Sequence, residues 1–187
     1  MIIRISGVSS LDDMIYELEC QLTQIRIESW MKHDLFSYQW WILVAALFIP
    51  WLLWWKWVDK KRLTEIILFG AIILIIASFL DAILSDLRLW EYNYYVIPLW
   101  PRLISADFTI IPVTYMFAYQ YFQGWKSFLL AMLVVSAFFA FIGEPLLVWL
   151  NIYTLHKWRH LYSFPIYFTM GALVKYLTQW ILAHNTK

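Results

Sequence analysis

Three carboxylic acids lie inside or beside the most apolar stretches of this sequence. Asp81 follows an almost wholly apolar run, Asp107 lies near the start of another such run, and Glu144 lies near the end of a third. A carboxyl group in an apolar environment is costly, so it normally faces a bundle interior or a watery cavity. Such a group can protonate a substrate, bind a cation or accept a hydrogen bond from a ligand hydroxyl. These three acids are therefore the candidate catalytic residues.

The positions of the acids along their helices predict that they share one layer. With a rise of about 1.5 Å per residue, Asp81 lies roughly 27 Å from the start of its helix, and Glu144 lies at a similar height in another. Asp107 lies about one turn into a helix that enters from the same side. We expect all three carboxyls near the outer membrane face. The alternative is that they pair there with loop bases and only hold the loops down.

Aromatic and basic residues on the adjoining loops complete a candidate pocket. The loop 85–102 is rich in Trp, Tyr and Pro, and Arg102 lies on the turn before Asp107 as its nearest candidate partner. The candidate ligand-binding residues are Trp90, Tyr92, Arg102, His156, Arg159 and Tyr162. We interpret this set as a pocket that opens outward and is covered by aromatic loops.

The composition indicates that lipid is the solvent for most of the chain. Of 187 residues, 63% are hydrophobic and only 14% are charged, whereas about a quarter of the residues in a soluble domain are charged. Five apolar runs are long enough for transmembrane helices. They cover residues 38–57, 63–84, 103–121, 127–149 and 162–183. We therefore predict an all-α fold, a polytopic membrane helix bundle over residues 36–187.

Residues 1–35 differ from the rest because they are rich in charge. Ser10 or Ser9 can cap a helix, with Asp12 and Asp13 favourable in its first turn. Apolar residues then recur at helical spacing at Leu11, Met14, Ile15, Leu18, Leu22 and Ile25. This pattern predicts an amphipathic helix that lies on the membrane or packs on the bundle. It is also a candidate docking element for a protein partner.

The basic residues predict the topology in a cell membrane. Lys56, Lys60, Lys61 and Arg62 form the strongest basic cluster, between the first two spans. Cytoplasmic loops carry such clusters. With five spans, the N-terminal helix is then outside and the C-terminus cytoplasmic, although Lys157 and Arg159 fall on the outer side.

The second and fourth spans end alike, which predicts an internal repeat. Asp81 is followed by Trp90 at the same separation as Glu144 is followed by Tyr153. Each segment leads through an aromatic, proline-containing stretch into the next span. Spans two and three would then be related to spans four and five by an axis along the membrane normal.

Several function classes find no support in the residues. The net charge of +1 and the lack of a basic face argue against nucleic-acid binding. The lone Cys20 excludes an internal disulfide. His156 and His160 could share a helix face, but without a definite third ligand they do not make a metal site. No phosphate loop or other cofactor motif is present, so no cofactor is predicted.

Several strings of residues resemble a family of small multi-pass membrane proteins of endospore-forming bacteria. They are residues 36–41, 50–51, 54–56, 58–62, 89–92, 119–122, 125–128, 144–145 and 162–167. The resemblance covers about residues 36–180 and implies a multi-pass fold but no particular activity.

A weaker similarity links the chain to the repeats of membrane carotenoid and lycopene cyclases. Asp81, Trp90, Tyr92 and Glu144 match those repeats in residue type. The similarity implies carboxyls that protonate an isoprenoid double bond. The chain departs from those enzymes because it lacks their Pro-x-Glu-Glu pair, which puts cyclase activity in doubt.

Taken together, these patterns favour a membrane protein that binds a lipid-like or isoprenoid ligand in an outer acidic and aromatic pocket. Membrane lipids are the expected partners. One alternative is a proton- or cation-coupled transporter, or a subunit of one, that uses the same acids. A second is a structural subunit of a membrane complex that docks through its N-terminal helix.

Overall fold

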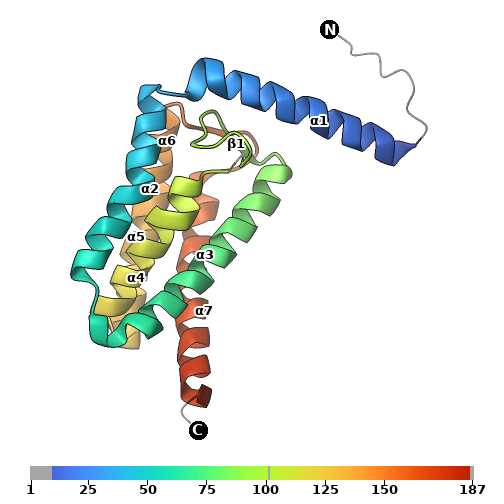
Figure 1. Ribbon diagram of the computed structural model, residues 1–187. Helices are drawn as coiled ribbons and strands as arrows, with labels where there is room; N and C mark the ends of the chain where they lie inside the picture. The colour runs from blue at the N-terminus through green and yellow to red at the C-terminus, as the bar shows by residue number, and fades with distance from the viewer. Residues whose placement is uncertain (1–9, 101, 186–187) are drawn as a thin grey trace.

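Helices make up most of the chain in the computed structural model, which describes residues 10–100 and 102–185 (Figure 1). The first half contains α1 (Leu11–Ser29), η1 (Trp30–Asp34), α2 (Tyr38–Trp57), η2 (Lys60–Arg62), α3 (Leu63–Asp86), β1 (Trp90–Tyr92), η3 (Ala106–Ile110) and α4 (Ile111–Tyr121). The second half contains α5 (Trp125–Phe138), η4 (Phe139–Gly143), α6 (Glu144–Trp149), β2 (Tyr153–Leu155) and α7 (His160–Asn185). The predicted all-α class is confirmed, with one small two-stranded sheet.

Three helices in the described ranges are long and apolar enough to cross a membrane. They are Tyr38–Trp57, Lys60–Asp86 and Trp125–Trp149. The other two predicted spans form helices but differ in character. The helix of the third predicted span consists of η3 and α4, with 5 and 11 residues. The fifth, α7, has 26 residues but carries Lys175 and many other polar side chains.

The helix starts follow from local capping. Ser10 accepts a hydrogen bond from the Asp13 amide at 3.1 Å, so the predicted cap of α1 is confirmed. Ser37 accepts in the same way from the Trp40 amide and starts α2. Each cap satisfies an amide that lacks a partner in the first helical turn.

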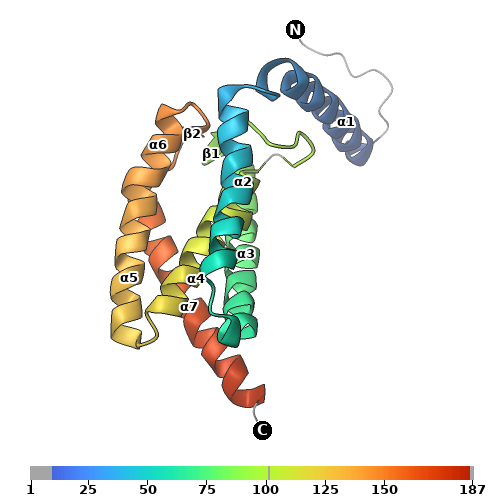
Figure 2. The same ribbon diagram turned by 60° about the vertical axis from the view of Figure 1, so that its left-hand side comes forward.

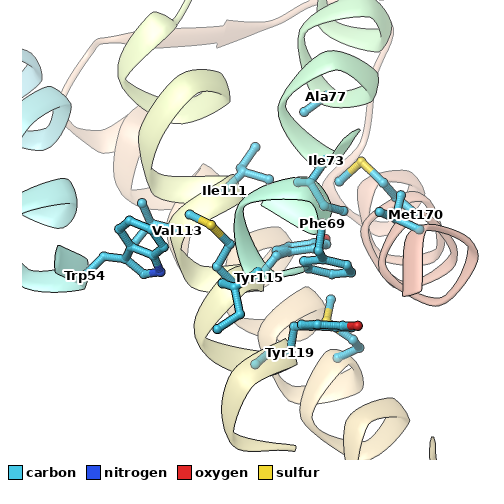
Figure 3. Close-up of a cluster of buried hydrophobic side chains, with 14 of the residues drawn as sticks. Trp54, Phe69, Ile73, Ala77, Ile111, Val113, Tyr115, Tyr119 and Met170 are labelled. Atoms are coloured by element: carbon cyan, nitrogen blue, oxygen red, sulfur yellow. The ribbon is translucent and has the colours of Figure 1, made fainter. Parts of the chain in front are cut away.

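The helices pack with α4 at the centre. Figures 1 and 2 show α3 and α5–α6 running in one direction and α4 and α7 returning. The middle of the bundle is filled by side chains such as Phe69, Tyr115 and Tyr119 (Figure 3). The rings of Phe69 and Tyr119 stack with centroids 4.3 Å apart. This apolar cluster separates the two polar ends of the bundle.

Two π-helical turns, η3 and η4, lie immediately before prolines. The Ile111 amide bonds the Ala106 carbonyl before Pro112, and the Glu144 amide bonds the Phe139 carbonyl before Pro145. Proline cannot donate to the carbonyl four residues earlier and clashes with it, so the hydrogen-bond ladder widens there. The Phe108 carbonyl, four residues before Pro112, accepts a bond from the Trp51 indole at 3.2 Å instead.

The predicted repeat is visible in how α3 and α6 end. Equivalent positions in the two halves of the repeat are 63 residues apart (144 minus 81, and 153 minus 90). At this separation, Arg88 and Asn151 both have left-handed backbone, with φ of 56° and 58°. The Leu89 amide bonds the Leu84 carbonyl, and the equivalent Ile152 amide bonds the Leu147 carbonyl. The two helices therefore end in the same way.

The strands that follow these ends pair with each other. In the antiparallel register Glu91 lies opposite Thr154, its own equivalent in the repeat. The Asn93 amide bonds the Ile152 carbonyl at 2.9 Å, and the His156 amide bonds the Leu89 carbonyl at 3.0 Å. These two bonds are also equivalent, so the strands are related by a local two-fold axis. We call the end of the bundle with this sheet the sheet end.

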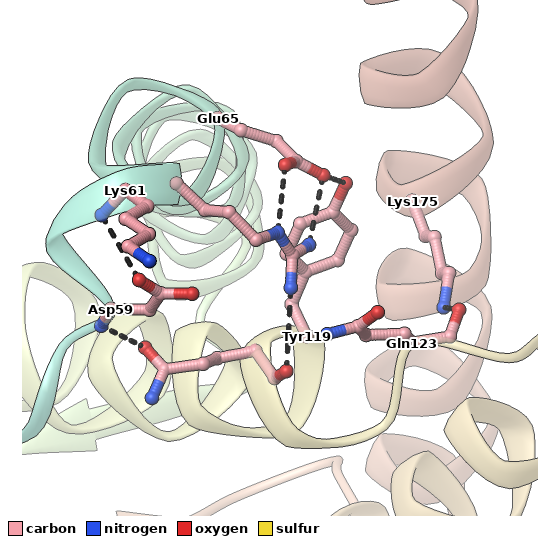
Figure 4. Close-up of polar contacts among 8 residues, drawn as sticks. Asp59, Lys61, Glu65, Tyr119, Gln123 and Lys175 are labelled. Carbon is pink, nitrogen blue, oxygen red and sulfur yellow. Dashed lines mark hydrogen bonds and ion pairs between the residues drawn. The ribbon is translucent and has the colours of Figure 1, made fainter.

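The opposite end, which we call the basic end, is tied by polar contacts between α3, α4 and α7 (Figure 4). Arg62 pairs with Glu65 at 3.0 Å, and the Tyr119 hydroxyl donates to Glu65 at 2.6 Å. Lys175 donates to the Phe122 and Gln123 carbonyls at 3.1 and 2.8 Å. Its side chain is buried against the ring of Phe128, so it stabilises the end of α4 rather than reaching water.

Helix α1 projects from the sheet end and buries none of its side chains (Figures 1 and 2). It is attached through η1, where the Trp30 indole donates to the Tyr95 carbonyl at 2.9 Å. Asp34 accepts from the Tyr95 amide at 3.1 Å, and burial raises the pKa of Asp34. The described part of the predicted 1–35 region is thus a helix, while residues 1–9 lie outside the described ranges.

Candidate ligand-binding site

One cavity of about 100 Å³ at the sheet end is lined by all three predicted acids, Asp81, Asp107 and Glu144. Each acid is at most 8% exposed. The cavity walls come from α3, η3, α6 and α7, and side chains of β1 and β2 also line it. The prediction that the three acids share one layer is confirmed.

Asp81 projects from α3 towards the sheet. Its Oδ1 accepts hydrogen bonds from the Tyr92 hydroxyl at 2.5 Å and from the Trp90 indole at 3.1 Å. Its Oδ2 is buried and has no hydrogen-bond partner within the described residues. One oxygen of Asp81 therefore holds the first strand in place while the other lacks a donor.

Asp107 reaches the cavity because η3 is fixed on α2. Ser105 and Thr109, on the other side of η3, donate to the Leu43 and Leu47 carbonyls at 2.7 and 3.0 Å. The carboxyl of Asp107 interacts directly with that of Asp81. Two buried carboxylates side by side repel each other, so a proton or a cation between them is favoured.

Arg102 lies beside this pair but has a different partner from the one predicted. Its Nη2 pairs with Asp86 at 2.7 Å, on the exposed rim of α3. The guanidinium still acts on the Asp81 and Asp107 carboxyls through its charge. Arg102 thus lies beside the acid pair, but its ion pair is with Asp86.

Glu144 has a fuller set of partners. Its Oε2 lies 2.8 Å from His160 Nδ1, and its Oε1 accepts from the Tyr167 hydroxyl at 3.1 Å. Both partners belong to α7, so Glu144 connects α6 to α7.

Aromatic rings of the sheet and of the turn before α7 cover the acids. Trp90 stands edge-on to Trp158, with centroids 5.1 Å apart and planes at 72°. Tyr92 stacks on Tyr153 at 5.5 Å. Burial raises the pKa of Tyr92 and of Tyr153, so both phenols remain protonated and can donate hydrogen bonds. The Trp158 indole donates to Ser163 at 2.8 Å, which fixes the turn.

Besides Arg102, three more predicted ligand-binding residues do not line the cavity. His156 pairs with Glu91 at 3.3 Å on the exposed side of the sheet. Arg159 is exposed, and Tyr162 is 46% exposed with its ring against Trp158. The strand register and the turn into α7 direct these side chains outward. Of the six predicted ligand-binding residues, the cavity is lined by Trp90 and Tyr92.

Several residues of the site were not predicted from the sequence. The cavity is also lined by Tyr153, Trp158, Ser163 and Tyr167. Tyr153 is the repeat equivalent of Trp90, which could have identified it. His160, Ser163 and Tyr167 follow a helical spacing that places them on one face of α7.

No group of three or more His, Cys, Asp or Glu side chains in the described part of the chain could hold a metal ion. Comparisons with protein-family models, with curated proteins and with solved structures find no match to this chain.

Proposed function

We propose that this protein is a five-span membrane protein that binds the polar end of a lipid-like ligand in the cavity at its sheet end. The observation that carries the proposal is the convergence of Asp81, Asp107 and Glu144 on one cavity under an aromatic cover. An apolar pocket with a few convergent polar groups is the common form of a ligand site. The acids would bind the ligand's polar group, as proton donors or as charges.

The packing of α4 and α7 supports five spans. Most residues of α4 are buried among α2, α3 and α5, so this helix needs little apolar surface of its own. Helix α7 exposes Leu173, Tyr176 and Trp180 on the bundle surface, where lipid would cover them. Both helices return along the same bundle axis as the three apolar ones (Figure 2).

The charge distribution supports an outward-facing cavity. Lys56, Lys60, Lys61 and Arg62 lie at the basic end, as the positive-inside rule expects of a cytoplasmic side. The N-terminal helix would then be outside and the C-terminus cytoplasmic, in the cell membrane.

The size of the cavity limits which part of the ligand it takes. A cavity of about 100 Å³ is small beside the roughly 300–1,000 Å³ of pockets that enclose a whole drug-sized ligand. It suits a head group rather than an isoprenoid chain. Leu80 and Leu84 of α3 and Ile166 of α7 line it and are only half-buried, so a tail could continue between α3 and α7 into the bilayer.

The test is mass spectrometry of lipids that copurify with the protein from membranes in a mild detergent. Ala77 is buried at the cavity wall, so Ala77→Leu should fill the cavity and reduce the bound lipid. Ala71→Leu, on the exposed side of α3, is the matched control and should leave it unchanged. Equal lipid content in all three proteins, or none in the wild type, would contradict the proposal.

Binding is favoured over transport by the apolar centre of the bundle. Phe69, Ile73 and Tyr115 are at most 1% exposed and belong to the apolar cluster in the middle of the bundle (Figure 3). A proton or cation would need a polar route through this region. Uptake into proteoliposomes that depends on Asp81 and Glu144 would favour the transporter instead.

A further inference from the structure

The charge of the cavity is unbalanced. Three carboxyls line it, those of Asp81, Asp107 and Glu144, and the bases that act on them are Arg102, which is already paired with Asp86, and His160. His160 is charged only when it is protonated. A cleft of one sign with apolar walls raises the local concentration of the opposite charge. The cavity therefore favours a cation.

One oxygen marks where the cation would bind. Asp81 is 7% exposed and lines the cavity, and its buried Oδ2 has no hydrogen-bond partner within the described residues. A buried acceptor without a donor is costly, and a donor with positive charge stabilises it most. The adjacent Asp107 carboxyl offers further oxygens to the same donor.

The aromatic cover favours an organic cation. Trp90 makes an angle of 72° with Trp158 and 58° with Tyr153, with centroids 5.1 and 6.1 Å away. Trp90, Tyr92, Tyr153 and Trp158 all line the cavity, and the faces of aromatic rings attract alkylammonium groups. A bare metal ion would need a cluster of carboxylate or imidazole ligands, and the described residues hold none.

We infer that the cavity recognises an alkylammonium group, so that the ligand is a lipophilic amine or a lipid with an ammonium head group. The inference rests on the proposed function and adds the chemical class of the ligand. In the bound state the ammonium lies between the Asp81 and Asp107 carboxyls and under the rings of Trp90 and Trp158. The alkyl chain continues between α3 and α7.

The experiment compares two probes of the same shape in maltoside micelles. Dodecylammonium carries the charge and the N–H donors, and tridecane has a methyl group in place of the ammonium. Binding is measured by native mass spectrometry and by the rise in melting temperature. We expect the ammonium probe to bind at least about tenfold more tightly than its isostere, since desolvated cation–π contacts and charge both favour it. Free ethylammonium, which lacks the long tail, competes at low concentration only if the ligand is a short free amine rather than a lipid.

Variants test the named acids. Asp81→Asn and Asp107→Asn should each weaken the ammonium probe about tenfold, a change of about 1.4 kcal/mol. Glu91→Gln is the control because Glu91 lies on β1 but faces away from the cavity, towards His156. If an Asn variant fails to fold, Ala77→Leu replaces it and should block both probes sterically.

The possible results separate the two proposals. Equal binding of both probes, unchanged in Asp81→Asn, overturns the ammonium inference and leaves the proposed function in place. No binding of either probe overturns the ammonium inference as well, and the proposed function then fails too if no lipid copurifies with the wild type.

Discussion

The two halves of the repeat end their first helices in the same way but differ in how their acids are paired. In the first half Asp81 faces a second carboxyl, Asp107, and keeps one oxygen without a partner. In the second half Glu144 has His160 and Tyr167 as partners. The position equivalent to Asp107 is Met170 (107 plus 63), which also lines the cavity. The repeat thus supplies the frame, and the differences between the halves supply the chemistry.

This difference assigns separate roles to the acids. A carboxyl whose oxygens are all satisfied by side chains of an adjacent helix contributes mainly to packing, whereas one that lacks a donor is ready for a ligand. We therefore expect the first half to bind the ligand and the second half to hold the cavity in shape.

The largest expected effect comes from removing the acid pair that distinguishes the first half from the second. The double variant Asp81→Asn and Asp107→Asn should weaken the ammonium probe about a hundredfold, or about 2.7 kcal/mol, if the two acids act independently. Glu144→Gln should weaken it only about threefold, because its partners remain able to bond an amide. Titration followed by native mass spectrometry measures both, and equal losses would show that the halves are equivalent.

The next effect concerns packing, where each half places a glycine against a methionine. A Cβ at Gly70 would overlap the sulfur of Met116, and one at Gly171 would lie 2.7 Å from Met132 Cε. Gly70→Ala should destabilise the protein by about 1–3 kcal/mol through overpacking. Gly171→Ala should cost less, because the Met132 methyl is a flexible end.

Thermal unfolding in maltoside micelles measures these changes. Gly143→Ala is the control, since its nearest neighbour would be 3.7 Å away. It should leave the melting temperature unchanged or raise it. A destabilisation by Gly143→Ala as large as that by Gly70→Ala would contradict this account of the packing.

A smaller effect tests the joint between the halves. Asn93 donates to the Asn151 carbonyl at 3.0 Å and to Thr154 at 2.9 Å, so its side chain bridges β1 and β2. Asn93→Ala should cost about 1 kcal/mol, the typical net value of a lost hydrogen bond, and should speed amide exchange in both strands. Faster exchange in β1 alone would show that the strands are held independently.

The smallest effect concerns α1, which is attached to the first half through Tyr95. Burial raises the pKa of Asp34 above its usual value of 3.8, so the attached state binds the proton more tightly than the detached state. The contribution of Asp34 to the stability of the attached state is fully present below pH 3.8, and it is lost as the pH rises through the raised pKa of Asp34. The protection factors of the η1 amides, which correct for the intrinsic pH dependence of exchange, should therefore be higher in acid than at neutral pH, and Asp34→Asn should remove the difference.

Much of the fold could be predicted from the sequence because apolar length and capping residues are local signals. The first predicted span, 38–57, coincides with α2, and Ser10 caps α1 as expected. The shared depth of Asp81, Asp107 and Glu144 also follows from helix rise alone. These features need no knowledge of which helices touch.

The rest depends on contacts between distant parts of the chain. His156 and Arg159 lie outside the cavity because of the register between β1 and β2, which pairs residues more than sixty positions apart. Arg102 pairs with Asp86 rather than with Asp107 because η3 turns Asp107 inward against α3. No pattern within a single segment encodes either arrangement.

The two π-helical turns also have a consequence for how this chain tolerates changes in length. Each turn holds one residue more than a regular α-helical turn. If one residue were deleted from 106–110 or from 139–143, the turn could therefore become ordinary α-helix and the helix would stay continuous. Because one turn closes with five residues before the deletion and with four after it, the residues on either side would keep nearly the same orientation. A protein shortened within 139–143 could thus keep its membrane helices and still direct Glu144 into the cavity.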